Sequence, residues 1–285
     1  MMAQVKAVIW ILTGMFFGAC NDVWVKYLNH IPAFEISCCR FFFSMVSLLP
    51  FVLIKKEYLK VKYPKVHFLR GIIFFSAITL WEIGVKNTML SVATLVGFSG
   101  TFFLLLMSKI ILGEKISLPR LLSTGISFLM ILGIVDFKNL SLGSSVIILL
   151  FGSFFFAVAD IINKKYSLLE NHITSIFYYN IFAFLISIPL ALKSFVMPTF
   201  IDFIYMVCLG FEANFYSFSL LRAFSLADAT FLTPFKYFEF VFSIFLGYIF
   251  FNEIPTLYCF VVIFVIIINN STLLLIEKKN SNNNL

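Results

Sequence analysis

Charged side chains stand at matching places inside two apolar stretches of this sequence. The stretch FGACNDVWVKY carries Asp22 and Lys26, and the stretch FAVADIINKKY carries Asp160 and Lys164. In both stretches the acid precedes the base by four residues, a spacing that brings two side chains together on one face of a helix. Burying an ionised group among apolar residues is costly, so each pair predicts either a helix end or an element that handles charge.

A second group of charges lies in the C-terminal part of the chain, where Glu212, Lys236 and Glu239 interrupt apolar runs. One ammonium and two carboxylates suit a solute that carries both signs of charge, because each charge on the solute then finds its opposite. These three residues are therefore the leading candidates for a binding site.

Composition indicates the surroundings of these charges. Of the 285 residues, 61% are hydrophobic and 12% are charged, and the mean hydropathy is +1.01. A soluble domain is about half apolar and a quarter charged, so the apolar surplus predicts a protein whose solvent is the lipid bilayer. The net charge of +7 is typical of basic cytoplasmic loops in such a protein, and we expect no nucleic-acid partner.

The sequence predicts an all-α polytopic membrane protein with ten transmembrane helices. About 20 apolar residues are needed to cross the hydrocarbon core, and ten windows of roughly that length occur. The predicted spans cover residues 5–27, 34–54, 67–86, 90–112, 119–135, 144–163, 173–194, 200–222, 227–251 and 257–276.

Residues that could support catalysis or bind a metal form no recognisable constellation. The five cysteines lie in apolar stretches without ligand spacing. The three histidines are scattered, and no phosphate-binding loop is present. We expect a protein that is not an enzyme, holds no cofactor or metal, and does not use ATP directly.

Basic residues predict how the chain is oriented. If the N-terminus lies in the cytoplasm, 15 of the 21 Lys and Arg residues fall at the inner ends of the predicted spans. This asymmetry is typical of cytoplasmic loops. We therefore expect both termini in the cytoplasm.

The two halves of the chain resemble each other. Asp22 matches Asp160 at 138 positions further on, Pro50 matches Pro189, and KNTMLSVATLV matches RAFSLADATFL. Each half has five predicted spans, an odd number, so the second half must enter the membrane upside down. Such inverted repeats build transporters with the solute near the midplane, although a channel or membrane enzyme is an alternative. We predict repeats at 1–138 and 139–276 and a polar, disordered tail at 277–285.

Several motifs carry a family resemblance over residues 10–276. The chain resembles the drug/metabolite transporter superfamily, EamA-type, and most closely its bacterial S-adenosylmethionine uptake transporters. The carrying motifs are NDVWVKYL, FEISCCRFFFSMVSLLPFV, HFLRGI, ADIINKKY, LLRAFSLADATFLTPFKYFEFVFS and FNEIP. The resemblance implies a bacterial inner membrane protein with a central cavity bounded by spans 1–4 and 6–9, and with spans 5 and 10 peripheral. The family often has a proline in span 4, where this chain has GFSGTFF.

Ionisable residues near the span ends are candidate gates. An alternative is that they merely end helices, because a long Lys side chain can reach the membrane surface. The candidates are Asp22, Lys26, Arg40 and Glu82 near the outer end, and Asp160, Lys164 and Asp228 near the inner end.

Span 9 predicts one polar helix face near the midplane. Pro234 should free backbone carbonyls of the preceding turn. A structural alternative is that Lys236 and Glu239 neutralise each other, and Glu212 is either protonated, paired or waiting for a cation. At 100° per residue the polar face comprises Ala229, Thr233, Lys236, Glu239, Ser243 and Gly247.

S-adenosylmethionine, the solute that the resemblance implies, fits these residue types. Glu212 and Glu239 can offset its sulfonium and ammonium, and Lys236 can bind its carboxylate. Aromatic faces can hold a sulfonium or an adenine ring. The candidates are Trp24, Trp81, Tyr216 and Tyr237, and Thr233 lies on the polar face of span 9. Gly97 and Gly100 are expected to serve close helix packing, and Glu114 and Glu253 to be loop or cap residues.

Three functions therefore compete at this point. The first is uptake of S-adenosylmethionine, with exchange for S-adenosylhomocysteine implied by the resemblance. The second is export of amino acids or other small metabolites through the same fold. The third is a membrane enzyme or scaffold without transport. The sequence predicts no oligomeric state.

Overall fold

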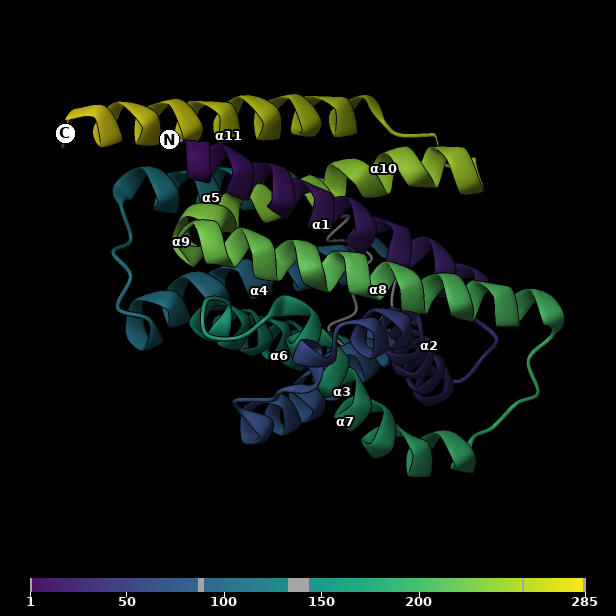
Figure 1. Cartoon of the computed structure of the whole chain (residues 1–285). Coiled ribbons are helices and arrows are strands. Elements are labelled where there is room, and N and C mark those ends of the chain that lie inside the picture. The colour runs from purple at the N-terminus through teal and green to yellow at the C-terminus, as the bar shows by residue number, and fades with distance from the viewer. Residues whose placement is uncertain (1, 87–89, 133–143, 253, 284–285) are drawn as a thin grey trace.

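The computed structural model describes residues 2–86, 90–132, 144–252 and 254–283, and these residues form helices joined by loops (Figure 1). The long helices are α1 (Met2–Tyr27), α2 (Ala33–Ile54), α3 (Pro64–Lys86), α4 (Leu90–Ile111), α5 (Leu118–Leu132), α6 (Ser144–Tyr166), α7 (His172–Lys193), α8 (Phe200–Leu226), α10 (Phe238–Phe251) and α11 (Leu257–Asn283). A short 3₁₀ helix, η1 (Lys56–Leu59), lies between α2 and α3.

Helix lengths agree with a membrane protein. Within the described residues, eight helical segments are long and apolar enough to cross a bilayer, and two further apolar helices, Val96–Ile111 and Leu118–Ile131, are shorter. The predicted tail is wrong in one respect, because α11 continues without a break to Asn283 instead of ending in disorder.

The ninth predicted span is a broken helix and not a continuous one. It consists of the single turn α9 (Ala229–Leu232), the 3₁₀ helix η3 (Thr233–Tyr237) and α10. Pro234 lies at the start of η3, and proline both lacks an N–H donor and clashes with the preceding turn of an α-helix. Counting 100° per residue across this break therefore places Thr233 on the wrong face.

The turn α9 is held at both sides by charged side chains. The carboxylate of Glu114 accepts hydrogen bonds from the amides of Ala229 and Thr230, at 3.0 and 2.9 Å. Arg120 forms ion pairs with Asp228 at 3.2 Å and with Glu277 of α11 at 2.9 Å. The expectation that Glu114 is a cap is thus confirmed, while its repeat equivalent Glu253 lies outside the described residues.

Helix contacts follow a reciprocal pattern between the two halves of the chain. Helix α1 packs on α8 and α10, while α6 packs on α3 and α4. Helix α2 packs on both α7 and α8, α7 packs on α3, and α5 packs on α11. The halves therefore interlock instead of forming two separate bundles. Apolar side chains of α1, α4, α6, α8 and the α9–η3 segment form the largest buried cluster.

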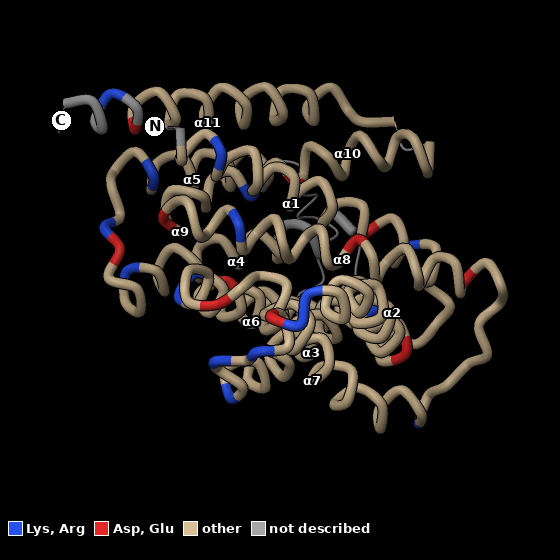
Figure 2. Tube along the Cα trace, in the orientation of Figure 1, with Lys and Arg blue, Asp and Glu red and all other residues tan. Residues whose placement is uncertain are grey.

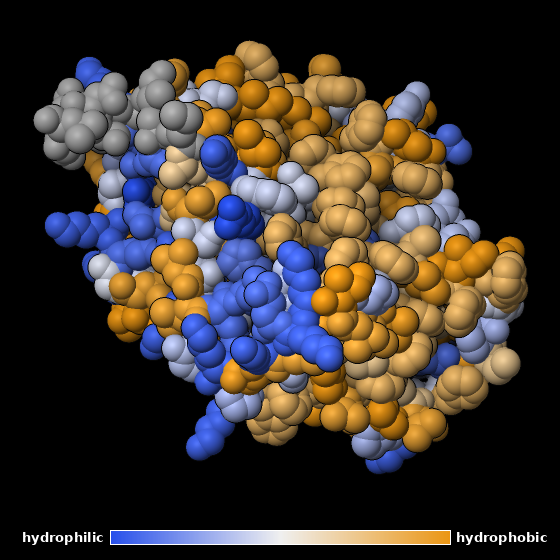
Figure 3. All heavy atoms as spheres, viewed as in Figure 1, coloured by the Kyte–Doolittle hydropathy of each residue, from blue (hydrophilic) through white to orange (hydrophobic). Residues whose placement is uncertain are grey.

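The surface divides into apolar and basic regions. Figure 3 shows a broad hydrophobic face, and beside it a hydrophilic patch. Figure 2 shows most Lys and Arg residues toward the end of the bundle where the two chain termini lie. Large exposed side chains such as Ile110, Phe200 and Leu257 are 78–82% accessible, which suits contact with lipid tails.

We expect Glu114→Ala to destabilise the protein by about 1–2 kcal/mol, because the change leaves two amides at the start of α9 without their acceptor. Thermal unfolding of the purified protein in detergent measures the effect. The matched control is Glu57→Ala on exposed η1, which should leave the unfolding temperature unchanged. Equal unfolding temperatures for both variants would contradict a capping role.

Candidate functional site

A central cavity lies where the two halves meet. It contains about 1040 Å³ of space free of atoms, counting the part at its open mouth. Residues of α1, α2, α3, α4, α6, α8, η3 and α10 line it. Among the described residues, helices α5 and α11 contribute none to the lining, in agreement with the predicted periphery of spans 5 and 10. Helix α7 contributes none either, which differs from the expectation that span 7 bounds the cavity.

The structure brings eight of the predicted site and gate residues into this one cavity. The depth sorting predicted from the sequence separated outer gates from a midplane site, but Asp22, Arg40 and Glu82 share the cavity with the midplane residues. The eight residues are Asp22, Arg40, Trp81, Glu82, Glu212, Tyr216, Lys236 and Glu239.

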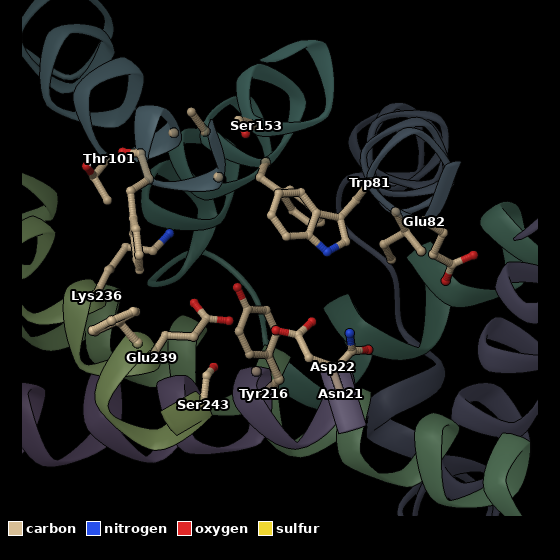
Figure 4. A pocket seen from close by; sticks show the side chains of 18 of the residues that line it. Asn21, Asp22, Trp81, Glu82, Thr101, Ser153, Tyr216, Lys236, Glu239 and Ser243 are labelled. Carbon is tan, nitrogen blue, oxygen red and sulfur yellow. Dashed lines mark hydrogen bonds between the residues drawn. The ribbon is translucent and has the colours of Figure 1, made fainter. Parts of the chain in front are cut away.

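Acidic side chains outnumber basic ones in the cavity. Four carboxylates line it, from Asp22, Glu82, Glu212 and Glu239, against the two cations of Arg40 and Lys236, which leaves two formal negative charges over. Figure 4 shows the carboxylates of Asp22 and Glu239 on one side of the cavity, with the Tyr216 hydroxyl between them. A surplus of carboxylates in a site of low dielectric favours a cationic solute.

Among the four acids, Glu212 is the one whose carboxylate is buried without any hydrogen bond to the described residues, and it is therefore the strongest candidate to bind a cation. Its side chain is 5% accessible, and both carboxylate oxygens are buried without a hydrogen-bond partner among the described residues. Glu82 differs, since it accepts a hydrogen bond from the Ser37 hydroxyl at 3.1 Å. A buried carboxylate with free acceptors is suited to receive a cation or a donor from a solute.

Lys236 is paired across the cavity wall. Its ammonium forms an ion pair with the carboxylate of Asp160 on α6, and so its partner is on another helix and not Glu239 on its own span. The Glu239 carboxylate instead extends toward α1, where a Cβ added to Gly18 would lie 2.5 Å from its Oε1 atom. The break after α9 thus aims the two charges of span 9 at different helices.

The Asp22–Lys26 and Asp160–Lys164 sequence pairs have different surroundings in the structure. The ammonium of Lys164 donates hydrogen bonds to the carbonyls of Phe224 and Ala227, at 2.9 and 2.6 Å, where α8 ends. In the first half, the Lys26 ammonium stands 4.0 Å from the ring centroid of Phe251 at the end of α10, and Asp22 faces the cavity.

Seven predicted residues do not line the cavity: Lys26, Asp160 and Lys164, described above, and Trp24, Tyr237, Thr233 and Asp228. Tyr237 is fully buried, and its hydroxyl shares a hydrogen bond with Thr101 at 2.7 Å. Thr233 is also fully buried and donates to the Ala229 carbonyl at 2.9 Å. Asp228 precedes α9 and pairs with Arg120. Tyr237 and Thr233 therefore support the cavity wall in this conformation, and neither lines it.

Trp81 and Tyr216 are the two predicted aromatic residues that line the cavity, and Phe98, Phe156 and Phe240 line it as well. Figure 4 shows the Trp81 indole entering the cavity from the side opposite Tyr216 and Glu239. Gly97 makes room for it, because an added Cβ would lie 2.5 Å from the indole Cη2 atom. Gly97 and Gly100 were assigned to helix packing from the sequence. They do pack closely, Gly100 against Ser153, and they also line the cavity.

Sequence reasoning missed several cavity residues. Asn21 accepts a hydrogen bond from Arg40, and its position beside Asp22 was the available signal. Ser153 and Thr101 are ordinary polar residues within apolar helices, and only the packing of α4 against α6 and η3 shows that they face the cavity.

Comparison with known proteins finds similarity to one family of transporters. The EamA-like transporter family profile matches residues 5–136 and again residues 143–274. An S-adenosylmethionine uptake transporter of Rickettsia prowazekii (strain Madrid E) is 34% identical over 252 residues, covering 88% of this chain and 86% of that protein. A pseudopaline exporter of Pseudomonas aeruginosa (strain UCBPP-PA14) is 26% identical, covering 86% and 87%. One solved crystal structure shares the fold, with a TM-score of 0.83 at 12% identity, over 96% of this chain and 98% of the other.

We expect Gly97→Ala to reduce solute transport by the protein in liposomes at least several-fold, because the new methyl group must push the Trp81 indole from its place. The matched control is Gly125→Ala on α5, where an added Cβ meets no atom within 4 Å. The control should transport at the wild-type rate. If both variants transport normally, the position of the indole has no role in the site.

Proposed function

The chain belongs to the EamA-like transporter family, and from that premise we propose that it is a secondary transporter for the uptake of S-adenosylmethionine across the bacterial inner membrane. The family membership makes it a multi-pass membrane transporter with a small-molecule substrate and not an enzyme. The observation that carries the choice of substrate is the cavity, which combines surplus carboxylates, one lysine and aromatic rings.

The chemistry of S-adenosylmethionine matches this lining group by group. The solute has a sulfonium, an ammonium, a carboxylate and an adenine ring, with a net charge of about +1 near neutral pH. We assign Glu212 and Glu239 to the two cations and Lys236 to the carboxylate. Trp81 and Tyr216 are assigned to the adenine or the sulfonium, because aromatic faces attract both. The two uncompensated carboxylates of the cavity then favour this cation over neutral metabolites.

We further propose that ten transmembrane helices form two inverted five-helix repeats, residues 1–138 and 139–276, that alternate access to the cavity. The twofold family match supports this arrangement. So does the reciprocal packing of the halves, in which α1 on α8 corresponds to α6 on α3, and α1 on α10 to α6 on α4. Inverted repeats that meet at a central site are the common basis of alternating access.

In the proposed orientation both termini are cytoplasmic. The concentration of Lys and Arg toward the end of the bundle that holds the termini supports this orientation. The cytoplasmic end then includes the Arg120 ion pairs and the Lys164 contacts, and the Asp22 end opens outward. We retain Asp22, Lys26, Arg40 and Glu82 as the outer gate, and Asp160, Lys164 and Asp228 as the inner gate.

Purified protein in liposomes should take up labelled S-adenosylmethionine with saturation, and internal S-adenosylhomocysteine should accelerate the uptake if the two are exchanged. Protein-free liposomes are the control. An exporter of amino acids would instead protect cells from toxic amino-acid analogues and would show no saturable uptake of S-adenosylmethionine. That combination would refute the proposed substrate.

Glu239→Gln and Lys236→Ala should each lower uptake at least ten-fold, because each removes a charge assigned to the solute, while both proteins still reach the membrane. Membrane insertion is checked by immunoblotting of the membrane fraction. The control is Asp202→Asn in the capping box at the start of α8, far along that helix from Glu212. Wild-type rates in both cavity variants would remove these residues from the site.

A further inference from the structure

We propose that Asp160 acts as an internal substitute for the solute carboxylate, so that the solute must displace Asp160 from Lys236 in order to bind. This inference rests on the proposed function and adds a specificity-determining residue to it. The geometry that carries it is the ion pair between the Asp160 carboxylate and the Lys236 ammonium at the edge of the cavity.

The position of the pair makes competition unavoidable. Lys236 lines the cavity, as does Ala157, which lies one turn before Asp160 on the same helix. Asp160 itself is 4% accessible and is not among the lining residues. Its carboxylate therefore binds the Lys236 ammonium on the side that faces away from the cavity. A solute carboxylate approaching from the cavity competes with Asp160 for the charge of the Lys236 ammonium, whose three hydrogens it can reach only in part while the ion pair holds.

The second cation of the cavity is a poorer choice for the solute carboxylate. Arg40 donates a hydrogen bond to the Asn21 side chain, and it lies on α2 near two of the four cavity acids, Asp22 and Glu212. Lys236 has one carboxylate as its ion-pair partner within the described chain, and that carboxylate has the same chemistry as the solute's. An exchange of one for the other conserves the charge balance around the lysine.

This substitution keeps Lys236 from becoming a lone buried cation. An ammonium left unpaired in the bilayer interior is costly, and breaking one partner from a buried pair is strongly destabilising. Asp160 neutralises Lys236 between two solute-binding events. The solute takes over that role when it binds, and so the lysine has a partner throughout the cycle.

Displacement of Asp160 also affects access to the cavity from the proposed cytoplasmic end. Helix α6 makes two charged contacts with the segment that runs from the end of α8 to η3. Asp160 contacts Lys236, and Lys164, one turn later, holds the carbonyls of Phe224 and Ala227. Binding of a solute carboxylate removes the first of these contacts and leaves the second. Solute binding is thereby linked to the strength of the contact between α6 and the α9–η3 segment.

The repeat shows that this device belongs to one half only. The offset of 136 that aligns RAFSLADATFL with KNTMLSVATLV places Lys236 opposite Gly100. The counterpart of Asp160 is Asp22, which lines the cavity, and in that half of the chain the position that corresponds to Lys236 is occupied by Gly100. Asp22 therefore remains available to a cation on the solute, while Asp160 is reserved for Lys236.

The test is equilibrium binding of two probes to purified protein. One probe is S-adenosylmethionine, and the other is its decarboxylated analogue, which keeps the sulfonium, the ammonium and the adenine. In Asp160→Asn the competing charge is gone, so S-adenosylmethionine should bind on the order of ten-fold more tightly, since apparent affinity rises with the fraction of competent sites. The decarboxylated analogue should gain no affinity.

Two further variants separate this role from a structural one. Lys164→Gln, on the same helix and interface, should leave the affinity ratio of the two probes at its wild-type value. The charge-balanced double variant Asp160→Asn/Lys236→Gln keeps the fold testable if the single variant unfolds, and it should show no gain of affinity for S-adenosylmethionine relative to the decarboxylated analogue. Equal changes for both probes in Asp160→Asn, or no tightening at all, would overturn the inference alone. Failure of the wild-type protein to bind S-adenosylmethionine would overturn the proposed function as well.

Discussion

The cost of holding charge inside a lipid bilayer is the constraint on which the rest of this structure depends. A chain with 12% charged residues can place few of them in the membrane, and each needs a partner. Lys236 has Asp160, Lys164 has two backbone carbonyls, and Glu82 has a serine. Glu212 has no such partner, and both its oxygens are buried and unbonded within the described chain. The site is thus defined by the charge that the fold leaves unsatisfied.

The break in span 9 determines where the charged side chains of that span point. Pro234 ends the α-helical hydrogen bonding after one turn, and Glu114 supplies acceptors for the amides at the start of that turn. The 3₁₀ segment then directs Lys236 to α6, and Glu239 reaches toward α1. Irregular backbone in a membrane is tolerated only where it is buried in protein or lines a cavity, and here it does both.

Much of the fold follows from the sequence alone, because apolar length and an internal repeat are local properties. The helix boundaries differ from the predicted spans by a few residues in most cases, and the candidates Glu212, Lys236, Glu239 and Trp81 all reach the cavity. Partners across helices are not local properties. No spacing rule indicated that Asp160 pairs with Lys236 and not with Lys164, or that Tyr237 is turned to Thr101. Helix periodicity also fails at Pro234, where the regular 100° step is lost.

The most direct test of the account is a structure of the protein bound to S-adenosylmethionine, determined by electron cryomicroscopy in a lipid nanodisc. The account predicts the solute in the central cavity, with its carboxylate on Lys236, its cations against Glu212 and Glu239, and Asp160 withdrawn from the lysine. A bound solute whose carboxylate lies elsewhere, with the Asp160–Lys236 pair intact, would contradict it.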